Sequence, residues 1–322
     1  MNDLGMNERA WRMADGYADR AGELRLNVHA LPGGARVLDA GVEARGGFGA
    51  GLMLAELCMG GLGHVSYAAI EIGGHAWPGV HVWTDHPATA CMASQYAGWA
   101  ITPEGYFAMG SGPLRAKARV EKELFGHIDY GEDPSRGVLV LEGASLPNDA
   151  VAEWVAGKAG VATNGITFAI APTASLAGGV QIAARVLETG LHKMETVGFD
   201  VRRVVSGIGN APVPPVAKDD MKASGRTHDC VLYGGQARST VDAGDDELSE
   251  LAAKLPASAS EDYGAPFIEI FKRYDNDFYK IDPLLFSPGE VWLTSIATGK
   301  TFHAGGLDSA VLARSLHGEY GD

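Results

Sequence analysis

Residues 137–190 alternate strand and helix patterns, and this alternation limits the fold more than any other stretch of the sequence. Residues 137–142 form a short apolar run typical of a buried strand. A helix opened by proline and closed by glycine is predicted over 148–159, and a second apolar strand follows over 166–171. Strands that alternate with helices are typical of α/β and two-layer α+β domains. The sequence therefore predicts a mixed α/β protein.

The next predicted helix follows the second strand after a turn of small residues. Thr173 or Ser175 can cap its start, because a hydroxyl accepts from the first backbone N–H groups of a helix. The apolar spacing then continues to Glu188, and Gly190 is predicted to end the helix as its C′ residue.

One face of that helix carries a narrow polar stripe. At about 100° per residue, Gln181, Arg185, Glu188 and His192 fall within roughly 60° of one another, while apolar residues cover most of the remaining circumference. A mostly buried helix must give such a stripe hydrogen-bond partners or a wet cleft. The stripe indicates either a functional site or an ion pair on a solvated edge.

Other segments carry turn and hairpin signals. Residues 204–215 contain three prolines and two glycines, which favours a loop or crossover. Three hairpins are predicted, over 24–31 with 35–40, 230–233 with 237–241, and 291–296 with 300–304. The length of 322 residues allows two domains, predicted as an N-terminal α/β domain over 1–130 and a C-terminal α/β domain over 131–322. An alternative in which the C-terminal segment returns to the first domain stays open.

Charge and hydropathy exclude several classes of partner. The net charge is −14, from 26 Lys and Arg against 40 Asp and Glu, and nucleic-acid-binding proteins usually need a basic surface. This acidity suits a cationic or small-molecule substrate, although solubility alone can explain it. No run approaches the 18 apolar residues of a spanning helix, and the first twenty residues are charged throughout. We therefore expect a cytoplasmic protein with no nucleic-acid or membrane partner.

Metal, nucleotide and acyl-enzyme motifs have weak support. Ten histidines include His64, His75, His81 and His86 within a short span, but their spacing fits no known ligand pattern. The three cysteines are widely spaced, without a CxxC pair. The glycine-rich loops match no phosphate-binding motif, and Gly-Ser-Gly at 110–112 lacks the full GxSxG pattern. No metal site is predicted.

Five blocks together resemble one known family. They are Phe-Ala-Met-Gly-Ser-Gly-Pro at 107–113, Ala-Pro-Thr-Ala-Ser-Leu at 171–176, Val-Leu-Tyr-Gly-Gly at 231–235, Asp-Tyr-Gly-x-Pro-Phe at 262–267 and Asp-Phe-Tyr-Lys-Ile-Asp at 277–282. In combination they are similar to the methenyltetrahydromethanopterin cyclohydrolases, and the resemblance runs over nearly the full length.

This resemblance implies an activity and an architecture. Family members reversibly hydrolyse the cyclic methenyl cation of tetrahydromethanopterin to the N5-formyl compound, without metal or redox cofactor. They serve methanogenesis in archaea and formaldehyde oxidation in methylotrophic bacteria. The implied fold is two α/β domains side by side, with the pterin in the cleft between them. A homo-oligomer is implied, and it is a trimer in archaeal members.

The resemblance also implies site residues. The catalytic Arg and Glu, three apart on a helix, fall on Arg185 and Glu188, which the polar stripe also isolates. Substrate-binding positions are expected at Tyr96, Ser111, Gly112, Thr173, Ser175 and Gln181. Archaeal relatives often carry a lysine where this chain has Tyr96, so a cationic contact from that position is in doubt. The basic residues after residue 113 could meet anionic groups on the pterin tail, and a solvated helix face explains them equally well.

The chemistry of the cation fits these residues independently. Its methenyl carbon shares one positive charge between two nitrogens, so hydrolysis needs a positioned water and a base. Glu188 can act as the base, and Arg185 can keep it ionised in a dry cleft. Two alternatives stay open at this point: a non-catalytic protein that binds a pterin or one-carbon carrier, and a metal-dependent hydrolase.

Overall fold

The chain passes three times between two structural units. The computed structural model describes residues 5–317, of which 5–64 and 88–181 form the first unit and 65–87 and 182–317 form the second. These units differ from the boundary predicted after residue 130. Residues 137–171 supply two strands to the sheet of the first unit, whereas residues 64–84 pair into the sheet of the second. The described C-terminal segment belongs to the second unit.

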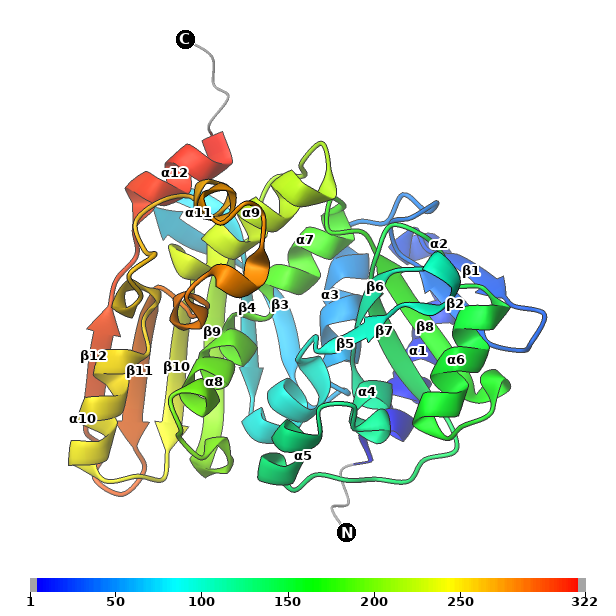
Figure 1. The fold of residues 1–322 in the computed structure, drawn as a ribbon, viewed down its shortest axis with the longest axis horizontal. Coiled ribbons are helices and arrows are strands. Elements are labelled where there is room, and N and C mark those ends of the chain that lie inside the picture. Colours follow the sequence, from blue (N-terminus) through cyan, green and yellow to red (C-terminus); the bar gives the residue numbers. More distant parts are fainter. Residues whose placement is uncertain (1–4, 318–322) are drawn as a thin grey trace. The chain divides into compact units, whose positions relative to one another are not determined.

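The first unit is built on a six-stranded sheet with the order β1-β2-β8-β7-β6-β5 (Figure 1). Strands β2, β8 and β7 are parallel to one another, and the remaining pairs are antiparallel. The strands are β1 (Asn27–Ala30), β2 (Arg36–Asp39), β5 (Trp99–Ile101), β6 (Ala108–Ser111), β7 (Gly137–Glu142) and β8 (Ile166–Ala171). The three parallel strands place their carboxyl ends at one edge of the sheet.

Helices cover both faces of this first sheet. The helical segments are α1 (Met6–Asp19), α2 (Ala21–Leu24), α3 (Phe48–Cys58), the π-helix η1 (Ala88–Gln95), η2 (Pro103–Gly105), α4 (Pro113–Ala118), α5 (Lys122–Ile128), α6 (Asp149–Ala159), η3 (Thr163–Gly165) and α7 (Leu176–Ala183). Residues of α1 and α3 share one buried cluster with β2, β7 and β8, and α6 contributes to a second cluster with alternate residues of the same strands. Burial on both faces explains why β7 and β8 are almost continuously apolar.

The second unit contains another six-stranded sheet, with the order β12-β11-β10-β9-β4-β3 (Figure 1). Its strands are β3 (His64–Ile72), β4 (His75–Thr84), β9 (Val204–Pro212), β10 (Gln236–Val241), β11 (Glu290–Ser295) and β12 (Thr301–Gly305). Its helical segments are α8 (Val186–Thr196), η4 (Val201–Arg203), α9 (Asp220–Leu232), α10 (Asp245–Lys254), η5 (Ala257–Ala259), α11 (Phe267–Arg273), η6 (Phe278–Lys280), η7 (Pro283–Leu285) and α12 (Ser309–His317). Helix α8 packs on β9 and β10, and α10 packs on β11 and β12.

Most local expectations are confirmed. The first and third predicted hairpins form as β1–β2 and β11–β12, both antiparallel. The predicted strand–helix–strand segment forms as β7, α6 and β8. Asn148 caps α6 and Gly160 ends it in the left-handed conformation. None of the helices within residues 5–317 combines the length and the apolar character needed to cross a bilayer.

The loop predicted over 204–215 is wrong, because residues 204–212 form the strand β9. This strand pairs antiparallel with both β4 and β10, so it lies inside the sheet. Its glycines do not mark a turn. A Cβ built on Gly207 would lie 2.8 Å from a Leu187 side-chain carbon, and one on Gly209 would lie 2.7 Å from a Val186 carbon. The glycines are needed because α8 packs directly on this strand.

The second predicted hairpin is also wrong. Residues 230–232, predicted as its first strand, are the last turn of α9, and β10 pairs parallel with β11 instead. A short apolar run does not by itself distinguish a strand from the end of a buried helix. Asp219 caps the start of α9 through the N–H of Lys222, at 2.8 Å.

The helix predicted to run to Glu188 is two helices, α7 and α8, separated at Ala184 and Arg185. Ser175 caps α7 as expected, since its Oγ accepts from the N–H of Gly178 at 3.0 Å. Gly190 does not end a helix but lies inside α8, which continues to Thr196. A Cβ on Gly190 would lie 3.4 Å from the Ala237 side chain, an ordinary van der Waals contact.

Candidate functional site

The first turn of α8 holds the two residues that the sequence singles out. Arg185 is the N-cap residue of α8, and Glu188 is the third residue of the helix. Both are buried, with exposed fractions of 8% and 6%. Because they are three apart at a helix start, their side chains lie on one face. The Thr189 hydroxyl donates to the Arg185 carbonyl at 2.9 Å, which fixes the backbone of this turn.

The break between α7 and α8 changes the electrostatics of Glu188. In the predicted helix, which ends at Glu188, this carboxyl would lie in the last turn, where backbone carbonyls disfavour an anion. In the structure it lies in the first turn of α8, where backbone N–H groups and the helix dipole favour negative charge. The break therefore supports an ionised Glu188 in buried surroundings.

The next turn of α8 adds two basic groups, of which His192 is half-buried and Lys193 is fully buried. Burial lowers the pKa of the His192 imidazole, although nearby Glu195 opposes this effect. Burial also lowers the pKa of Lys193 to about 8, and its Nζ donates to the carbonyl of Leu284 in η7. This hydrogen bond holds α8 against the segment that contains η7.

Gln181, the first member of the predicted stripe, lies on α7 with an exposed fraction of 3%. It is the last residue of the first unit, and the chain enters the second unit at Ile182. The helix break at Ala184 and Arg185 follows within a few residues. The predicted stripe is therefore divided between the two units.

The turn between β8 and α7 lies at the carboxyl edge of the first sheet, where ligands commonly bind in open α/β sheets. Thr173 donates its hydroxyl to Oε1 of Glu142, the last residue of the neighbouring strand β7. Ser175 is occupied in starting α7, because its Oγ also donates to the Pro172 carbonyl at 2.7 Å. Glu142 was not among the predicted site residues, although a carboxylate that ends a buried strand is a signal for this edge.

Asp39 ends the third parallel strand, β2, and organises the loop beside that turn. Its fully buried carboxylate accepts four backbone N–H groups, those of residues 41–44, at 2.7–2.9 Å. Gly41 in this loop approaches Ser175 so closely that a Cβ would lie 2.9 Å from the serine Oγ. Asp39 therefore holds a loop against the start of α7, a role that sequence reasoning missed.

Ser111, Gly112 and Tyr96 form another neighbourhood of the first unit. Ser111 is buried, and its hydroxyl donates to the Val140 carbonyl at 3.3 Å. Gly112 has a φ of 95°, which favours glycine, and its N–H donates to the carbonyl of Ser94 in η1 at 2.7 Å. Tyr96 follows η1, and its N–H donates to the Cys91 carbonyl at 2.8 Å. Long π-helices are rare and often mark functional sites.

A fully buried arginine supports this neighbourhood. Nη1 of Arg115 donates to the η1 carbonyls of Met92 and Ala93 at 3.2 and 2.8 Å, and its Nε pairs with Glu121 at 2.9 Å. The guanidinium lies 4.9 Å from the centre of the Tyr96 ring. Of the basic residues expected to meet a pterin tail or solvent, Arg115 does neither and braces the unit internally.

One group of side chains in the described residues has the spacing of a metal site. Ligand atoms of His29, Asp39 and Glu43 lie within 4.8 Å of one another. Each Asp39 oxygen already accepts two N–H groups, which uses the lone pairs that an ion would need. His64, His75, His81 and His86 do not form such a group among residues 5–317. The side chains therefore fit a resident metal poorly.

The fold and the site together define the class: an α/β protein of two units, with a buried Arg and Glu at the start of a helix. The family model described as Cyclohydrolase (MCH) matches residues 5–316. The chain belongs to this cyclohydrolase family, which confirms the resemblance read from the motifs.

Curated relatives agree with this assignment. The chain is 47% identical to "Methenyltetrahydromethanopterin cyclohydrolase" of Methylobacillus flagellatus, covering 92% of this chain and 91% of the relative. Relatives of the same name from Methanosarcina barkeri and Methanococcoides burtonii are 42% and 39% identical, each covering 97% of this chain and 98% of the relative. A pterin substrate is implied by the family.

The Asp39 loop generates a stability prediction. Asp39→Asn replaces one carboxylate oxygen by an NH₂ group that faces two N–H donors, so we expect the free energy of unfolding to fall by about 2–5 kcal/mol. Urea unfolding followed by circular dichroism measures this change. Asp149→Asn is the matched control, because that half-buried carboxylate accepts the single N–H of Gly33, and the substitution should cost less than about 1 kcal/mol. Equal losses in the two variants would contradict the role assigned to Asp39.

Proposed function

We propose that this protein reversibly hydrolyses 5,10-methenyltetrahydromethanopterin to N5-formyltetrahydromethanopterin in one-carbon metabolism. The family match over residues 5–316 carries this proposal. Relatives with the corresponding name come from both methylotrophs and methanogens, so the pathway served is formaldehyde oxidation or methanogenesis. A non-catalytic carrier-binding protein and a metal-dependent hydrolase are not favoured by these relatives.

We assign the proton transfer to Glu188. Attack of water on the methenyl carbon forms a C–O bond while the water loses a proton to the base. The other C–N bond then breaks as its nitrogen keeps the electron pair and takes up a proton, while the new hydroxyl gives up its own. This leaves the N5-formyl group and releases one proton overall. The buried carboxylate at the start of α8 is suited to accept that proton. Its charge also attracts the cationic substrate, although that attraction fades as the charge is neutralised and so aids binding more than the barrier.

Arg185 is assigned as the electrostatic partner of Glu188. A guanidinium remains charged at any ordinary pH, and from the N-cap of α8 it lies on the same face as the carboxylate. It would keep Glu188 ionised and orient the water or the developing negative oxygen. Its own burial argues against a merely solvated ion pair.

The substrate-binding part of the proposal comprises Tyr96, Ser111, Gly112, Thr173, Ser175 and Gln181. Thr173, beside Glu142 at the sheet edge, and Tyr96, braced by Arg115, offer side chains to a ligand. The hydroxyls of Ser111 and Ser175 are hydrogen-bonded within the first unit, so these residues would act by shaping the backbone. Gly112 would do the same through its positive φ.

The proposal includes three further statements. Turnover needs no metal or other cofactor, because the pterin derivative is itself the substrate. The protein is a homo-oligomer, a trimer by family resemblance. It is cytoplasmic, as expected from composition, and has neither a nucleic-acid nor a membrane partner.

The role of Glu188 is tested by Glu188→Gln, which keeps the shape of the side chain and removes the charge and the proton acceptor. Loss of a general base typically costs about 10²- to 10⁴-fold in rate, so we expect kcat to fall in that range. Because the variant also removes one charge of a buried pair, its Tm should fall, and the rate is measured well below that Tm. The absorbance of methenyltetrahydromethanopterin, corrected for spontaneous hydrolysis, measures the rate. Glu195→Gln, on the same helix, is the control and should stay within a few-fold of the parent.

Two results of that experiment would count against the proposal. If Glu188→Gln keeps activity within a few-fold of the parent, the Arg185–Glu188 pair has only a structural role. A parent protein that binds the pterin but leaves its spectrum unchanged with time would favour the carrier-binding alternative.

The partner role of Arg185 predicts a change in pH dependence. In Arg185→Leu the buried carboxylate loses its cation, so a higher pH is needed to ionise it. We expect the acidic limb of the kcat profile to move towards higher pH, with the remaining activity recovering as pH rises. An acidic limb that does not move would show that Arg185 does not control the ionisation of Glu188.

The absence of a metal requirement is tested by exhaustive chelation of the purified protein. We expect the rate of hydrolysis to be unchanged, since the Asp39 oxygens in the one suitably spaced group of residues 5–317 are already hydrogen-bonded. Activity that is lost on chelation and restored by zinc or another divalent ion would support a metal-dependent hydrolase instead.

A further inference from the structure

The proposed reaction leaves one proton on the enzyme in each turnover, and Glu188 must lose it before the next one. Glu188 begins a turnover as a carboxylate and ends it as a carboxylic acid, because it takes a proton from the attacking water. Its exposed fraction is only 6%, which limits direct exchange with bulk water. A neighbouring side chain that accepts the proton would restore the carboxylate.

One face of α8 carries the polar residues in a line. Arg185, Glu188 and His192 follow one another at spacings of three and four residues, so they are neighbours along the helix surface. Val186 and Leu187 lie against the glycines of β9. At about 100° per residue, these two apolar residues fall on the opposite side of the helix from Glu188 and His192. The polar face is therefore turned away from the second sheet.

His192 is placed and built to accept the proton. Helical side chains lean towards the N-terminus, so the His192 imidazole leans towards the turn that carries Glu188. His192 is half-buried whereas Glu188 is buried, so the ring lies between the carboxyl and solvent. Burial lowers the pKa of His192 below its ordinary value, so at neutral pH the ring is mostly neutral and readily releases a proton that it accepts. Arg185, on the other side of Glu188, keeps its own proton at ordinary pH.

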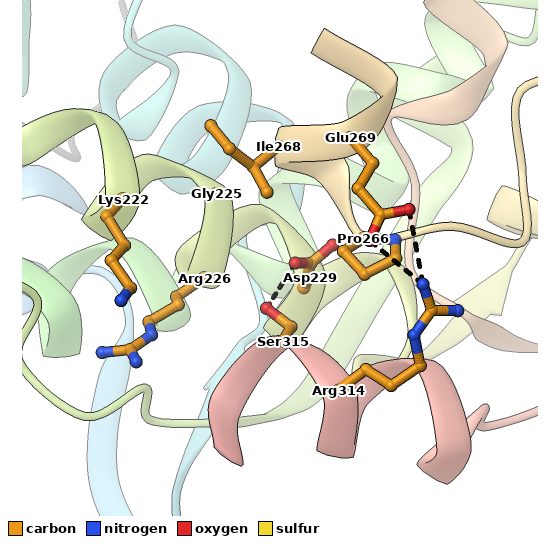
Figure 2. Close-up of a pocket in the computed structure, with 9 residues that line it drawn as sticks. All are labelled: Lys222, Gly225, Arg226, Asp229, Pro266, Ile268, Glu269, Arg314 and Ser315. Carbon is orange, nitrogen blue, oxygen red and sulfur yellow. Dashed lines mark hydrogen bonds and ion pairs between the residues drawn. The ribbon is translucent and has the colours of Figure 1, made fainter. Parts of the chain in front are cut away.

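Two other groups of the second unit have a pKa near neutrality, but their positions do not suit this role. Burial lowers the pKa of Lys193 to about 8, and its Nζ is bonded to the Leu284 carbonyl. Burial raises the pKa of Asp229 to about 7, but this residue lies on α9. Figure 2 shows its carboxyl directed at Ser315 of α12, whose hydroxyl donates to it at 2.5 Å. On the polar face of α8, the neutral acceptor next to Glu188 is His192.

We propose that His192 relays the proton between Glu188 and solvent, an inference that rests on the proposed function. In hydrolysis the Glu188 carboxyl gives its proton to a ring nitrogen of His192, which restores the carboxylate. The imidazolium then releases a proton to water or to a buffer base. In the reverse reaction the same groups carry a proton inwards. Only O–H and N–H bonds form and break, and His192 acts through Glu188 without contacting the reacting carbon.

The test is His192→Gln, which keeps a polar side chain and removes the proton acceptor. Hydrolysis of methenyltetrahydromethanopterin by the full chain is followed by absorbance at neutral pH and constant ionic strength, in low and in high imidazole. Each rate is corrected for hydrolysis without enzyme in the same buffer. In low imidazole we expect kcat to fall about tenfold below the parent. Since binding and attack precede proton release, kcat/KM should stay within about twofold.

Imidazole should restore the variant, because a small base from solution replaces the missing ring. At high imidazole we expect kcat to return to within about twofold of the parent, whose own kcat should change less than about twofold over the same range. His192→Ala is the second variant, which opens space for imidazole and should show the same loss and recovery. His303→Gln is the matched control. It removes a β12 imidazole that pairs with Glu290 at 2.9 Å, and should follow the parent at both concentrations.

Three results would overturn the relay while the cyclohydrolase function stands. These are parental kcat in both His192 variants in low imidazole, a loss of kcat that imidazole does not restore, and an equal loss in kcat and kcat/KM. The second and third would show a structural role for His192. A parent protein that does not hydrolyse the substrate would instead overturn the proposed function itself.

Discussion

The contact between α8 and β9 is the constraint on which the proposed catalytic site depends. Val186 and Leu187 lie against Gly207 and Gly209, where a Cβ would come within 2.7–2.8 Å of the helix side chains. Because β9 is hydrogen-bonded on both edges, it cannot yield to a displaced helix. The strand therefore fixes the distance of the first turn of α8 from the sheet and its rotation about the helix axis. The position of Glu188 is fixed with them. A side chain in place of either glycine would therefore displace Glu188, the proposed base.

The break between α7 and α8 lies close to the point where the chain passes from the first unit to the second. Helix α7 is held in the first unit, where Gly51 of α3 approaches so closely that a Cβ would lie 2.5 Å from Val180. Helix α8 is held on β9 in the second unit. The helical run is interrupted at Ala184 and Arg185, between these two contacts. The break leaves Glu188 at a helix start, where backbone N–H groups favour the negative charge that a base requires.

Local sequence signals correctly predicted the elements whose defining interactions are made within their own segment. The Ser175 cap and the β1–β2 hairpin are of this kind. The same signals failed at β9, since its glycines serve the approach of α8, which sequence spacing does not reveal. They failed at the helix break as well, where no proline or glycine interrupts the apolar pattern. The polar stripe and the family motifs together singled out Arg185 and Glu188 as candidates. They missed Asp39 and Glu142, and they gave Arg115 a pterin-tail contact or a solvated face in place of its internal contacts, because the partners of all three are determined by tertiary structure.

In the first unit, buried charged side chains stabilise the backbone instead of taking part in the proposed reaction. Asp39 binds four N–H groups of one loop, and Arg115 binds two carbonyls of the π-helix η1. Each places a full charge where backbone groups lack regular partners, which is how irregular backbone is stabilised away from water. Hydrolysis of an already electrophilic methenyl carbon demands exact placement of water and base more than a strong catalyst. The first unit holds its loops with buried charged side chains, and the second holds α8 against the glycines of β9. Both arrangements meet that demand because they are rigid.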